Sequence, residues 1–283
     1  MHDGGRPEWL KVGAPIGDLY DRTESIVGKH RLNTVCMEAV CPNRRECYDA
    51  MTATFMILGH ICTRDCGFCA VVHGQPDTPD AGEPERIAAA VSELGLEYVV
   101  ITSVTRDDLS DGGAGHFAST VDALKGIDGQ PAIETLIPDF KGDRWSLSQV
   151  VDSHPDVISH NVETVPSLYE RVRPGASYIR SLRLLEAAKD INGDIKTKSG
   201  IMLGLGETIS EIESVFRALI GSGCDYLTIG QYLRPSPANI PVREYMHPER
   251  FESLKNLAED MGFIHVEAGP LVRSSYHAAL PVR

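Results

Sequence analysis

Short apolar runs alternate with amphipathic stretches through the middle of this chain, and this alternation limits the fold more than any other feature. Between the runs, apolar residues recur every three or four positions, as they do on one face of a surface helix. Strands that alternate with helices pair in parallel through right-handed crossovers. The sequence therefore predicts an α/β fold with these six strands: Thr54–Leu58, Tyr98–Thr102, Ala132–Leu136, Val157–His160, Lys198–Leu203 and Tyr226–Gly230.

The length of the chain limits which parallel fold can form. Its 283 residues are too few for eight strand–helix units with flanking segments. We therefore expect a partial (β/α)6 barrel of the TIM type over residues 54–230, with an extension at each end. Residues 1–53 are predicted to be an irregular N-terminal extension. Residues 231–283 read as a Pro-rich linker, a helix near Pro248–Met261 and an irregular tail.

The cysteines are clustered. Six of the seven form two groups of three with unequal spacings, Cys36-x4-Cys41-x5-Cys47 and Cys62-x3-Cys66-x2-Cys69. In a reducing cytosol, grouped thiols indicate metal or redox ligands rather than disulfides. The second group follows the first predicted strand, at the carboxyl end where the active sites of barrel enzymes lie. The seventh, Cys224, is expected to be a small buried hydrophobe.

Two kinds of metal site compete for these thiols. Structural zinc usually takes four ligands from paired Cys-x2-Cys hairpins, and neither group has that spacing. A [4Fe–4S] cluster takes one ligand for each iron, so three cysteines leave one iron open to bind something else. The spacing favours iron–sulfur clusters, and structural zinc is the competing interpretation.

The second group is typical of the radical S-adenosylmethionine (SAM) superfamily. With the upstream triplet, the segment CPNRRECYDAMTATFMILGHICTRDCGFC and the near-terminal Arg273-Ser274-Ser275-Tyr276, the chain resembles the lipoyl synthase family. One departure is Asp65-Cys66-Gly67, where that family commonly has Arg-Cys-Pro. Matching segments run almost from end to end and include RPEWL, ITSVTRDDLSDGGAGHF, IETLIPDF, HNVETV, RPGASY, TKSGIMLGLGE, IGQYL and GPLVRSSYHA.

The resemblance implies a radical reaction carried by cofactors, with no side chain as catalytic acid or base. Cys62, Cys66 and Cys69 would hold a [4Fe–4S] cluster whose open iron binds SAM. One electron would then split SAM into methionine and a 5′-deoxyadenosyl radical. The residues implied to contact SAM are Phe68, Asn161, Glu163, Ser181, Arg183, Gly204 and Glu207.

The upstream triplet would hold a second, auxiliary [4Fe–4S] cluster. Its ligands would be Cys36, Cys41 and Cys47, with the hydroxyl oxygen of Ser275 as the fourth. Oxygen is a harder ligand than thiolate, so the iron on Ser275 is expected to be the most easily released. The family reaction takes sulfur from this cluster and inserts two sulfur atoms at C6 and C8 of a protein-bound octanoyl-lysine, which forms the lipoyl cofactor.

Charge limits the classes of partner. The chain carries 27 Lys and Arg against 40 Asp and Glu, and residues 54–230 supply nearly all of the excess, with 14 basic and 26 acidic residues. This balance disfavours a nucleic-acid binder. No apolar run reaches the ~18 residues of a membrane span. The start of the chain has no signal-peptide pattern either, so we expect a cytoplasmic protein.

The resemblance also implies three partners. They are an octanoylated lipoyl carrier domain (a 2-oxoacid dehydrogenase E2 or the glycine-cleavage H protein), a ferredoxin or flavodoxin as electron donor, and an iron–sulfur carrier for cluster repair. Such carriers are generally acidic, so an acidic barrel should repel them. We expect docking on the charge-balanced flanks, with these candidate contacts: Arg6, Lys11, Lys29, Arg31, Arg44 and Arg45.

Two other functions remain open on the sequence. A different radical SAM enzyme with an auxiliary cluster, biotin-synthase-like or methylthiolating, is disfavoured by the upstream position of the extra triplet and by the RSSY tail. A zinc- or iron–sulfur-binding sensor would have no need of SAM cleavage, and it would be colourless if it held zinc.

Overall fold

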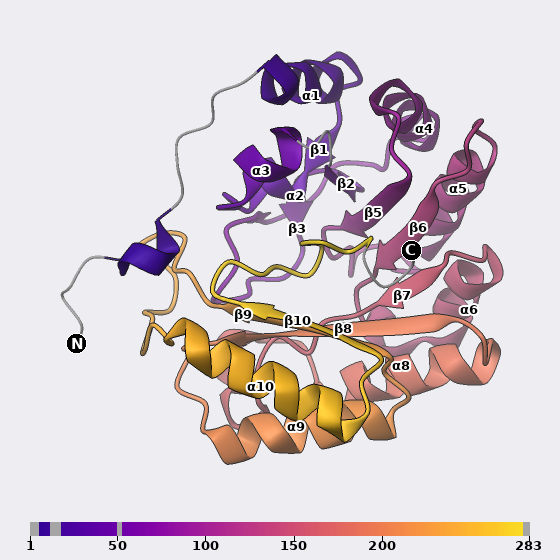
Figure 1. Ribbon diagram of the computed structural model, residues 1–283. Coiled ribbons are helices and arrows are strands. Elements are labelled where there is room, and N and C mark those ends of the chain that lie inside the picture. The colour runs from indigo at the N-terminus through magenta and orange to yellow at the C-terminus, as the bar shows by residue number, and fades with distance from the viewer. Residues whose placement is uncertain (1–5, 12–17, 50–52, 280–283) are drawn as a thin grey trace.

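The six strands that the alternation predicts all form in the computed structural model, and they pair in parallel in sequence order (Figure 1). The structure describes residues 6–11, 18–49 and 53–279. Within these ranges the main sheet has eight strands, in the order β1-β2-β5-β6-β7-β8-β9-β10. Their bounds are β1 Asn33–Thr34, β2 Thr54–Ile57, β5 Tyr98–Ser103, β6 Ala132–Leu136, β7 Val157–Ser159, β8 Lys196–Leu203, β9 Tyr226–Gln231 and β10 His265–Gly269.

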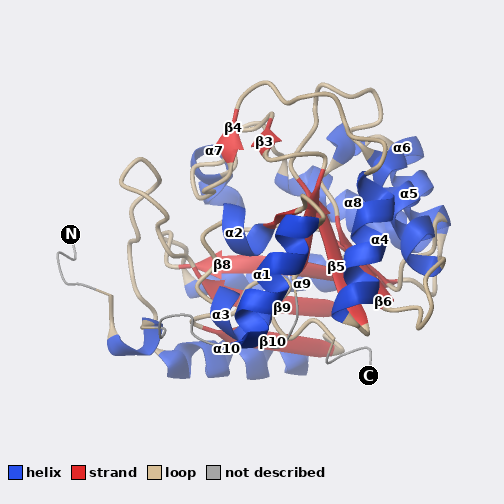
Figure 2. Cartoon of the chain, turned by 90° about the horizontal axis from the view of Figure 1, so that it is seen from above, coloured by secondary structure: helices blue, strands red, loops and turns tan. Residues whose placement is uncertain are grey.

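A helix of at least nine residues connects each parallel strand to the next and packs on the outside of the sheet (Figure 1; Figure 2). This confirms the partial barrel of six strand–helix units. These six helices are α4 Glu83–Leu94, α5 Ala114–Lys125, α6 Arg144–Asp152, α8 Tyr178–Ile191, α9 Ile209–Gly221 and α10 Pro248–Met261. The shorter or peripheral elements are α1 Asp18–Lys29, α2 Val35–Glu38, α3 Arg44–Asp49, α7 Tyr169–Val172, the 3₁₀ turns Glu8–Leu10, Phe140–Gly142 and Pro166–Leu168, and the separate pair β3 Ile61–Cys62 and β4 Val72–His73. In the described ranges, no helix is both long and apolar enough to cross a membrane.

Alternation along the strands gives the sheet two different faces. Residues such as Phe55, Ile101 and Ile201 point to the helices and belong to the apolar clusters there. Their neighbours point to the inner face, which carries polar groups. Lys198 Nζ lies 3.0 and 2.9 Å from the two carboxylate oxygens of Glu134, and both side chains are buried. Parallel sheets are usually apolar on both faces, so the polar inner face marks the side on which a site is built.

Two segments predicted to be irregular form regular elements instead. The N-terminal extension contains α1, α2, α3 and the strand β1, which pairs antiparallel with the edge of β2. The segment after α10 contains β10, which pairs parallel with β9 over five residues. Both predictions were wrong because the apolar signal is weak. In β10, His265 and Glu267 alternate with the buried Val266, and charged residues interrupt the apolar positions of α1.

The tail after β10 turns back across the middle of the molecule, between the N-terminal and C-terminal strands (Figure 1). The Val272 carbonyl lies against Gly230 in β9, at a place where a Cβ on Gly230 would be 2.2 Å from that oxygen. Only glycine allows this approach of one backbone to another. The tail therefore lies on the polar inner side of the sheet.

Candidate functional site

The second cysteine group lies on a loop that leaves the carboxyl end of β2. Leu58 begins the loop with a positive φ of 69°, which turns the chain out of the strand. Two side chains hold this turn. Glu83 accepts the Leu58 N–H at 2.8 Å, and Arg106 donates to the Leu58 carbonyl at 3.2 Å. Cys62 then follows in the short strand β3.

The thiols of the second group lie close together. The Cys62 sulfur accepts two backbone N–H groups, from Arg64 at 3.4 Å and from Thr105 at 3.3 Å. Burial raises the pKa of Cys66 to about 12 and that of Cys69 to about 11, and neighbouring thiols of the group raise both pKa values as well. A thiolate at this place therefore needs a positively charged group beside it, which a metal cluster supplies.

A loop after β9 covers this cysteine loop. The side-chain amide of Asn239 donates to the Cys69 carbonyl at 2.8 Å, and the Ile240 N–H donates to the Gly67 carbonyl at 3.0 Å. The Gly67 N–H itself donates to the Val172 carbonyl at 3.1 Å. Proline has no N–H to donate. Glycine in place of the proline common in the family thus adds a backbone hydrogen bond that holds the loop.

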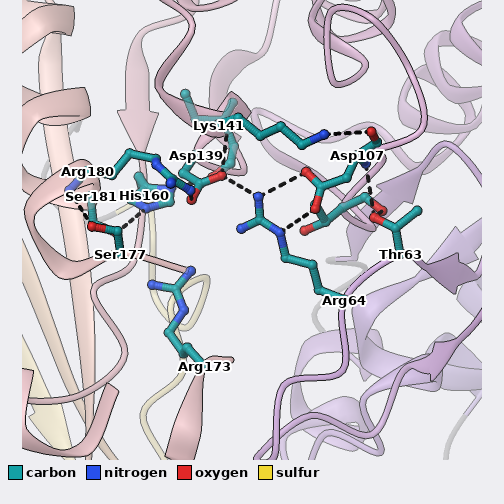
Figure 3. A network of polar contacts seen from close by, with 12 residues as sticks. Thr63, Arg64, Asp107, Asp139, Lys141, His160, Arg173, Ser177, Arg180 and Ser181 are labelled. Carbon is teal, nitrogen blue, oxygen red and sulfur yellow. Dashed lines mark hydrogen bonds and ion pairs between the residues drawn. The ribbon is translucent and has the colours of Figure 1, made fainter. Parts of the chain in front are cut away.

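Arg64, between the first two cysteines of the group, ties the loop to the ends of β5 and β6 (Figure 3). Its guanidinium donates to both carboxylate oxygens of Asp107, at 2.7 and 3.0 Å, and to Asp139 at 2.6 Å. Asp139 also accepts from Arg180 at 3.0 Å. Burial acts to raise the pKa of Asp139, but the hydrogen bond and charge of Arg64 outweigh it and hold that pKa well below its usual range. Asp139 therefore stays ionised and anchors the loop.

Asn161, Glu163 and Arg173 lie beside the second group, beyond the end of β7. Glu163 has a φ of 66° and forms a bridge with Ile201. Burial raises the pKa of Glu163, and the nearby Arg173 lowers it. The Asn161 amide donates to the Glu163 carboxylate at 3.0 Å. Burial is the main cause that raises the pKa of Cys66, and the charge of Glu163 raises it further. Glu163 therefore faces the cysteine loop.

The first cysteine group is shaped by the end of the short helix α2. The Cys41 N–H donates back to the Cys36 carbonyl at 3.2 Å. Val40, between them, takes the left-handed conformation with a φ of 49°, which glycine usually occupies at a helix end. Burial raises the pKa of Cys36 to about 11 and that of Cys47 to about 12, with the other thiols of the group as a further cause. These three thiols therefore also lie together.

The C-terminal tail brings Ser275 to the first group. The Thr54 hydroxyl donates to the Ser275 hydroxyl at 2.7 Å. Burial raises the pKa of Cys36, and a hydrogen bond from the Thr54 backbone N–H to the sulfur lowers it. The neighbouring Ser274 accepts from the Asn161 amide at 2.5 Å, beside the second group. The RSSY segment thus contacts residues at both cysteine groups.

These surroundings fit iron–sulfur clusters and SAM better than zinc. All seven cysteines are free thiols. In the described part of the chain, no three His, Cys, Asp or Glu side chains converge as they would on a single metal ion. Two triplets of neighbouring thiols match the ligand sets of multi-iron clusters instead. Beside the second group, buried Asn161 Oδ1 and Arg173 Nε have no hydrogen-bond partner among the described residues, and the amino and carboxylate groups of a ligand such as SAM can satisfy them.

Three of the predicted SAM contacts lie on the loops around the second group. Phe68 is half-buried and packs against the apolar cluster that contains Val172. The Glu207 carboxylate accepts the Gly204 N–H and two further N–H groups of its own turn. A Cβ on Gly204 would lie 2.2 Å from Gln231 Nε2, so the protein itself requires glycine there. Glu207 and Gly204 therefore have structural roles that are independent of a cofactor.

Ser181 and Arg183 are placed differently. Ser181 is completely buried, and its hydroxyl lies 2.9 Å from His160 Nε2 and 3.3 Å from the Tyr169 hydroxyl. Arg183 is exposed on α8. In the described structure neither has a hydrogen bond or ion pair with a residue of the two cysteine groups.

Three residues that the sequence analysis did not single out belong to the site: Thr54, Arg64 and Arg173. Arg64 stands within the Cys-x3-Cys spacing, and that position was an available signal. Thr54 and Arg173 lie in segments that match the family, but the sequence does not show their contacts. The partner of Thr54, Ser275, is 221 residues away, and Arg173 reaches the second group only once the barrel closes.

His160 makes the stability of this region depend on pH. The Ile137 carbonyl, 2.8 Å from His160 Nδ1, can only accept, so Nδ1 carries the proton and Nε2 accepts from Ser181. Burial lowers the pKa of His160 from 6.5 to about 4. Between these two values the unfolded chain binds a proton that the folded chain does not. The free energy of unfolding therefore falls as pH drops through this window.

The expected contribution of His160 is about 3 kcal/mol of stability, present above the unfolded pKa and lost as pH falls toward the folded one. Anaerobic denaturant titrations from pH 6.5 to 4 should show this loss in the wild type and a much smaller one in His160→Gln. His154→Gln, which changes an exposed histidine, should behave as the wild type. Equal slopes in the wild type and His160→Gln would contradict the assignment.

A six-unit parallel barrel with Cys62, Cys66 and Cys69 on the loop after its first strand defines a radical SAM protein, and a model of the Radical SAM superfamily matches residues 56–219. Solved structures share this fold. Streptococcus suis SuiB bound to its precursor peptide SuiA aligns with a TM-score of 0.57 and 11% identity, over 92% of this chain and 56% of SuiB. HydG, a maturase of the [FeFe]-hydrogenase, aligns with a TM-score of 0.52 and 12% identity, over 93% of this chain and 71% of HydG.

Curated relatives narrow the class to one family. The lipoyl synthase of Caldanaerobacter subterraneus subsp. tengcongensis is 55% identical over 273 residues, which cover 96% of this chain and 95% of that protein. The lipoyl synthase of Alkaliphilus metalliredigens is 53% identical over 274 residues, which cover 97% and 94%. The chain belongs to the lipoyl synthase family. It is therefore a radical SAM sulfurtransferase that uses SAM and [4Fe–4S] clusters to insert two sulfur atoms at C6 and C8 of an octanoyl-lysine, and the sensor and biotin-synthase-like alternatives are excluded.

Proposed function

We propose that the two cysteine groups divide this reaction between them. Cys62, Cys66 and Cys69 hold the [4Fe–4S] cluster that binds SAM, and the first group, with Ser275, holds the cluster from which sulfur is taken. When bound, these cofactors supply the one-electron chemistry and the sulfur that an unactivated C–H bond requires. The chain's own residues hold the clusters, orient SAM and keep water away.

The observation that supports this proposal most is the position of the tail. Ser275 Oγ lies 2.7 Å from Thr54, whose backbone N–H donates to the Cys36 sulfur. A serine from the far end of the chain is thus held beside the three upstream thiols, which would otherwise lack a fourth ligand. Ser274, on Asn161, continues the same segment toward the SAM side, so the tail closes the space between the two groups.

Metal content tests the proposal directly. Anaerobically reconstituted wild-type protein should hold about eight iron atoms per chain, and about four after alanine replaces all three cysteines of either group. Iron and acid-labile sulfide assays with metal analysis measure this. Zinc in either group, or loss of all iron when one group is removed, would overturn the assignment.

The proposal gives each segment of the chain a role. Residues 1–53 carry the ligands of the sulfur-donating cluster, residues 54–230 form the SAM barrel, and residues 231–283 supply the closing tail. We further propose a ferredoxin or flavodoxin as electron donor and an iron–sulfur carrier that rebuilds the spent cluster. Free thiols and oxygen-sensitive clusters suit the reducing cytoplasm, which we propose as the location.

The octanoylated carrier domain is proposed to dock on the N-terminal flank. Arg45 is exposed, and its Nε lies 3.8 Å from an Asp49 carboxylate oxygen. The Arg44 guanidinium lies 5.7 Å from the centre of the Tyr20 ring. Both follow Cys41 in the first group, so a carrier bound here would present its lysine arm close to the sulfur source. Of the other predicted contacts, Lys29 pairs with Glu93 and Lys11 with Glu8.

Reversal of the charges of Arg44 and Arg45 should weaken binding of the carrier domain without changing the reaction on a short peptide. Arg44→Glu/Arg45→Glu is expected to raise the KM for an octanoylated carrier domain about tenfold or more at low salt, because like charges then face an acidic partner. Turnover of a short octanoyl-lysine peptide should change little. Arg217→Glu/Arg250→Glu, on the outer helices α9 and α10, is the matched control. If Arg44→Glu/Arg45→Glu causes equal losses with carrier and peptide, the docking site is elsewhere.

A further inference from the structure

Thr54, the first residue of β2, contacts two of the ligands proposed for the sulfur-donating cluster. It is 6% exposed and points to the inner face of the sheet. Its hydroxyl donates to the Ser275 hydroxyl at 2.7 Å, and its backbone N–H donates to the Cys36 sulfur. One residue at the fixed start of a strand thus holds a thiol and a hydroxyl that come from opposite ends of the chain.

The direction of the side-chain bond matters for what Ser275 can do. Because Thr54 donates, the Ser275 oxygen accepts and still has a second lone pair for another partner. Hydrogen bonds from outer residues fix the orientation of metal ligands, and loss of such a bond typically costs about 10- to 100-fold in metal affinity or activity. The hydroxyl of Thr54 is placed to act in this way on the one oxygen ligand of the cluster.

The rest of the tail is held without help from Thr54. The Asn43 amide donates to the Leu271 carbonyl at 2.7 Å, and the Asn161 amide donates to Ser274 at 2.5 Å. Both contacts precede Ser275 in the chain, and directly after it the Tyr276 hydroxyl donates to the Glu46 carboxylate at 3.0 Å. Removal of the Thr54 hydroxyl should therefore leave the tail in place and release only the neighbouring serine side chain, which can then rotate to another rotamer.

We propose that Thr54 is a positioning residue for the sulfur-donating cluster: its hydroxyl holds the Ser275 oxygen beside Cys36 and so retains the iron that this oxygen completes. This inference rests on the proposed function, in which Ser275 is a ligand. It adds the reason why so weakly bound an iron stays in place until sulfur is taken.

Four single variants and one double variant, Thr54→Val/Ser275→Ala, test the inference in the full-length protein, reconstituted anaerobically with Mössbauer-active iron. Thr54→Val removes the hydroxyl with little change of shape, Thr54→Ser retains it, and Ser275→Ala removes the ligand. Thr102→Val is the matched control, because Thr102 is also on the inner face, is 7% exposed and donates to the Leu136 carbonyl at 2.8 Å. The readouts are the rate of iron release to a chelator and the Mössbauer spectrum of the oxygen-bound iron.

Thr54→Val should release iron from this cluster about 10- to 100-fold faster than the wild type, and it should lose the spectrum of the oxygen-bound iron as Ser275→Ala does. Thr54→Ser and Thr102→Val should match the wild type. In the Ser275→Ala background, Thr54→Val should add nothing, because the threonine acts only through that serine.

Three results would overturn the inference, and they differ in whether they also reject Ser275 as a ligand of the cluster. Wild-type iron release in Thr54→Val, with the spectrum lost in Ser275→Ala, rejects only the role of Thr54. A wild-type spectrum in Ser275→Ala rejects the proposed ligand, and the inference with it. An additive loss in Thr54→Val/Ser275→Ala shows that the threonine acts through the fold rather than through Ser275.

Discussion

Alanine at Cys41 is expected to abolish sulfur insertion while SAM is still cleaved. Cys41 belongs to the first group, beside Cys36 and Cys47 and at the end of α2. Loss of one of three thiolates should prevent the sulfur-donating cluster from assembling, because only two thiolates and the weaker Ser275 oxygen then remain to hold its four irons. The second group lies on a different loop, held by Arg64, and should bind its cluster and SAM as before.

The corresponding variant in the second group, Cys66→Ala, should abolish both SAM cleavage and sulfur insertion. 5′-Deoxyadenosine and the octanoyl-lysine peptide are measured by mass spectrometry in the same reaction. Cys224→Ala is the control, because Cys224 is a buried thiol in the apolar cluster behind β9 and should leave both products unchanged. If Cys41→Ala stops SAM cleavage as completely as Cys66→Ala does, the two groups do not act separately.

Methionine at Arg64 is expected to release the second cysteine loop and to deplete its iron. Arg64 is 8% exposed and Asp139 1% exposed, so the variant leaves a buried carboxylate whose remaining ion-pair partner among the described residues is Arg180 (Figure 3). Breaking a buried ion pair by removing one partner costs about 3–5 kcal/mol. The loop loses this anchor within the Cys-x3-Cys spacing, so less than half of the iron of that cluster should remain after gel filtration.

The double variant Arg64→Met/Asp139→Asn separates loss of the anchor from the cost of a buried charge. If the unpaired carboxylate causes most of the damage, the double variant should recover much of the lost thermal stability but little of the iron. Arg144→Met, which breaks an exposed ion pair with Asp190, should change neither quantity. Full iron content in Arg64→Met would show that the covering loop after β9 suffices to hold the cysteines.

The sequence predicts the parts of this molecule that depend on local pattern. All six strands follow from short apolar runs, and each cysteine group follows from its own spacing. The position of the second group at the carboxyl end of β2 follows as well, because a loop after the first barrel strand must lie there.

What the sequence does not predict depends on residues that meet only in the folded chain. The hydrogen bond between Thr54 and Ser275 joins β2 to the C-terminal tail, and Arg64 forms an ion pair with Asp139 beyond the end of β6. The strand β10 escapes prediction because its inner-face residues are polar. The resemblance implies that Ser181 contacts SAM, but in the fold the Ser181 hydroxyl is buried against His160. A sequence motif does not show this contact.

The decisive measurement is the mass of an octanoyl-lysine peptide after reaction with reconstituted protein, SAM and a reductant. The peptide should gain two sulfur atoms, and 5′-deoxyadenosine should form in the same reaction. If both cysteine groups hold intact clusters and 5′-deoxyadenosine forms while the peptide gains no sulfur, the first group is not the sulfur source.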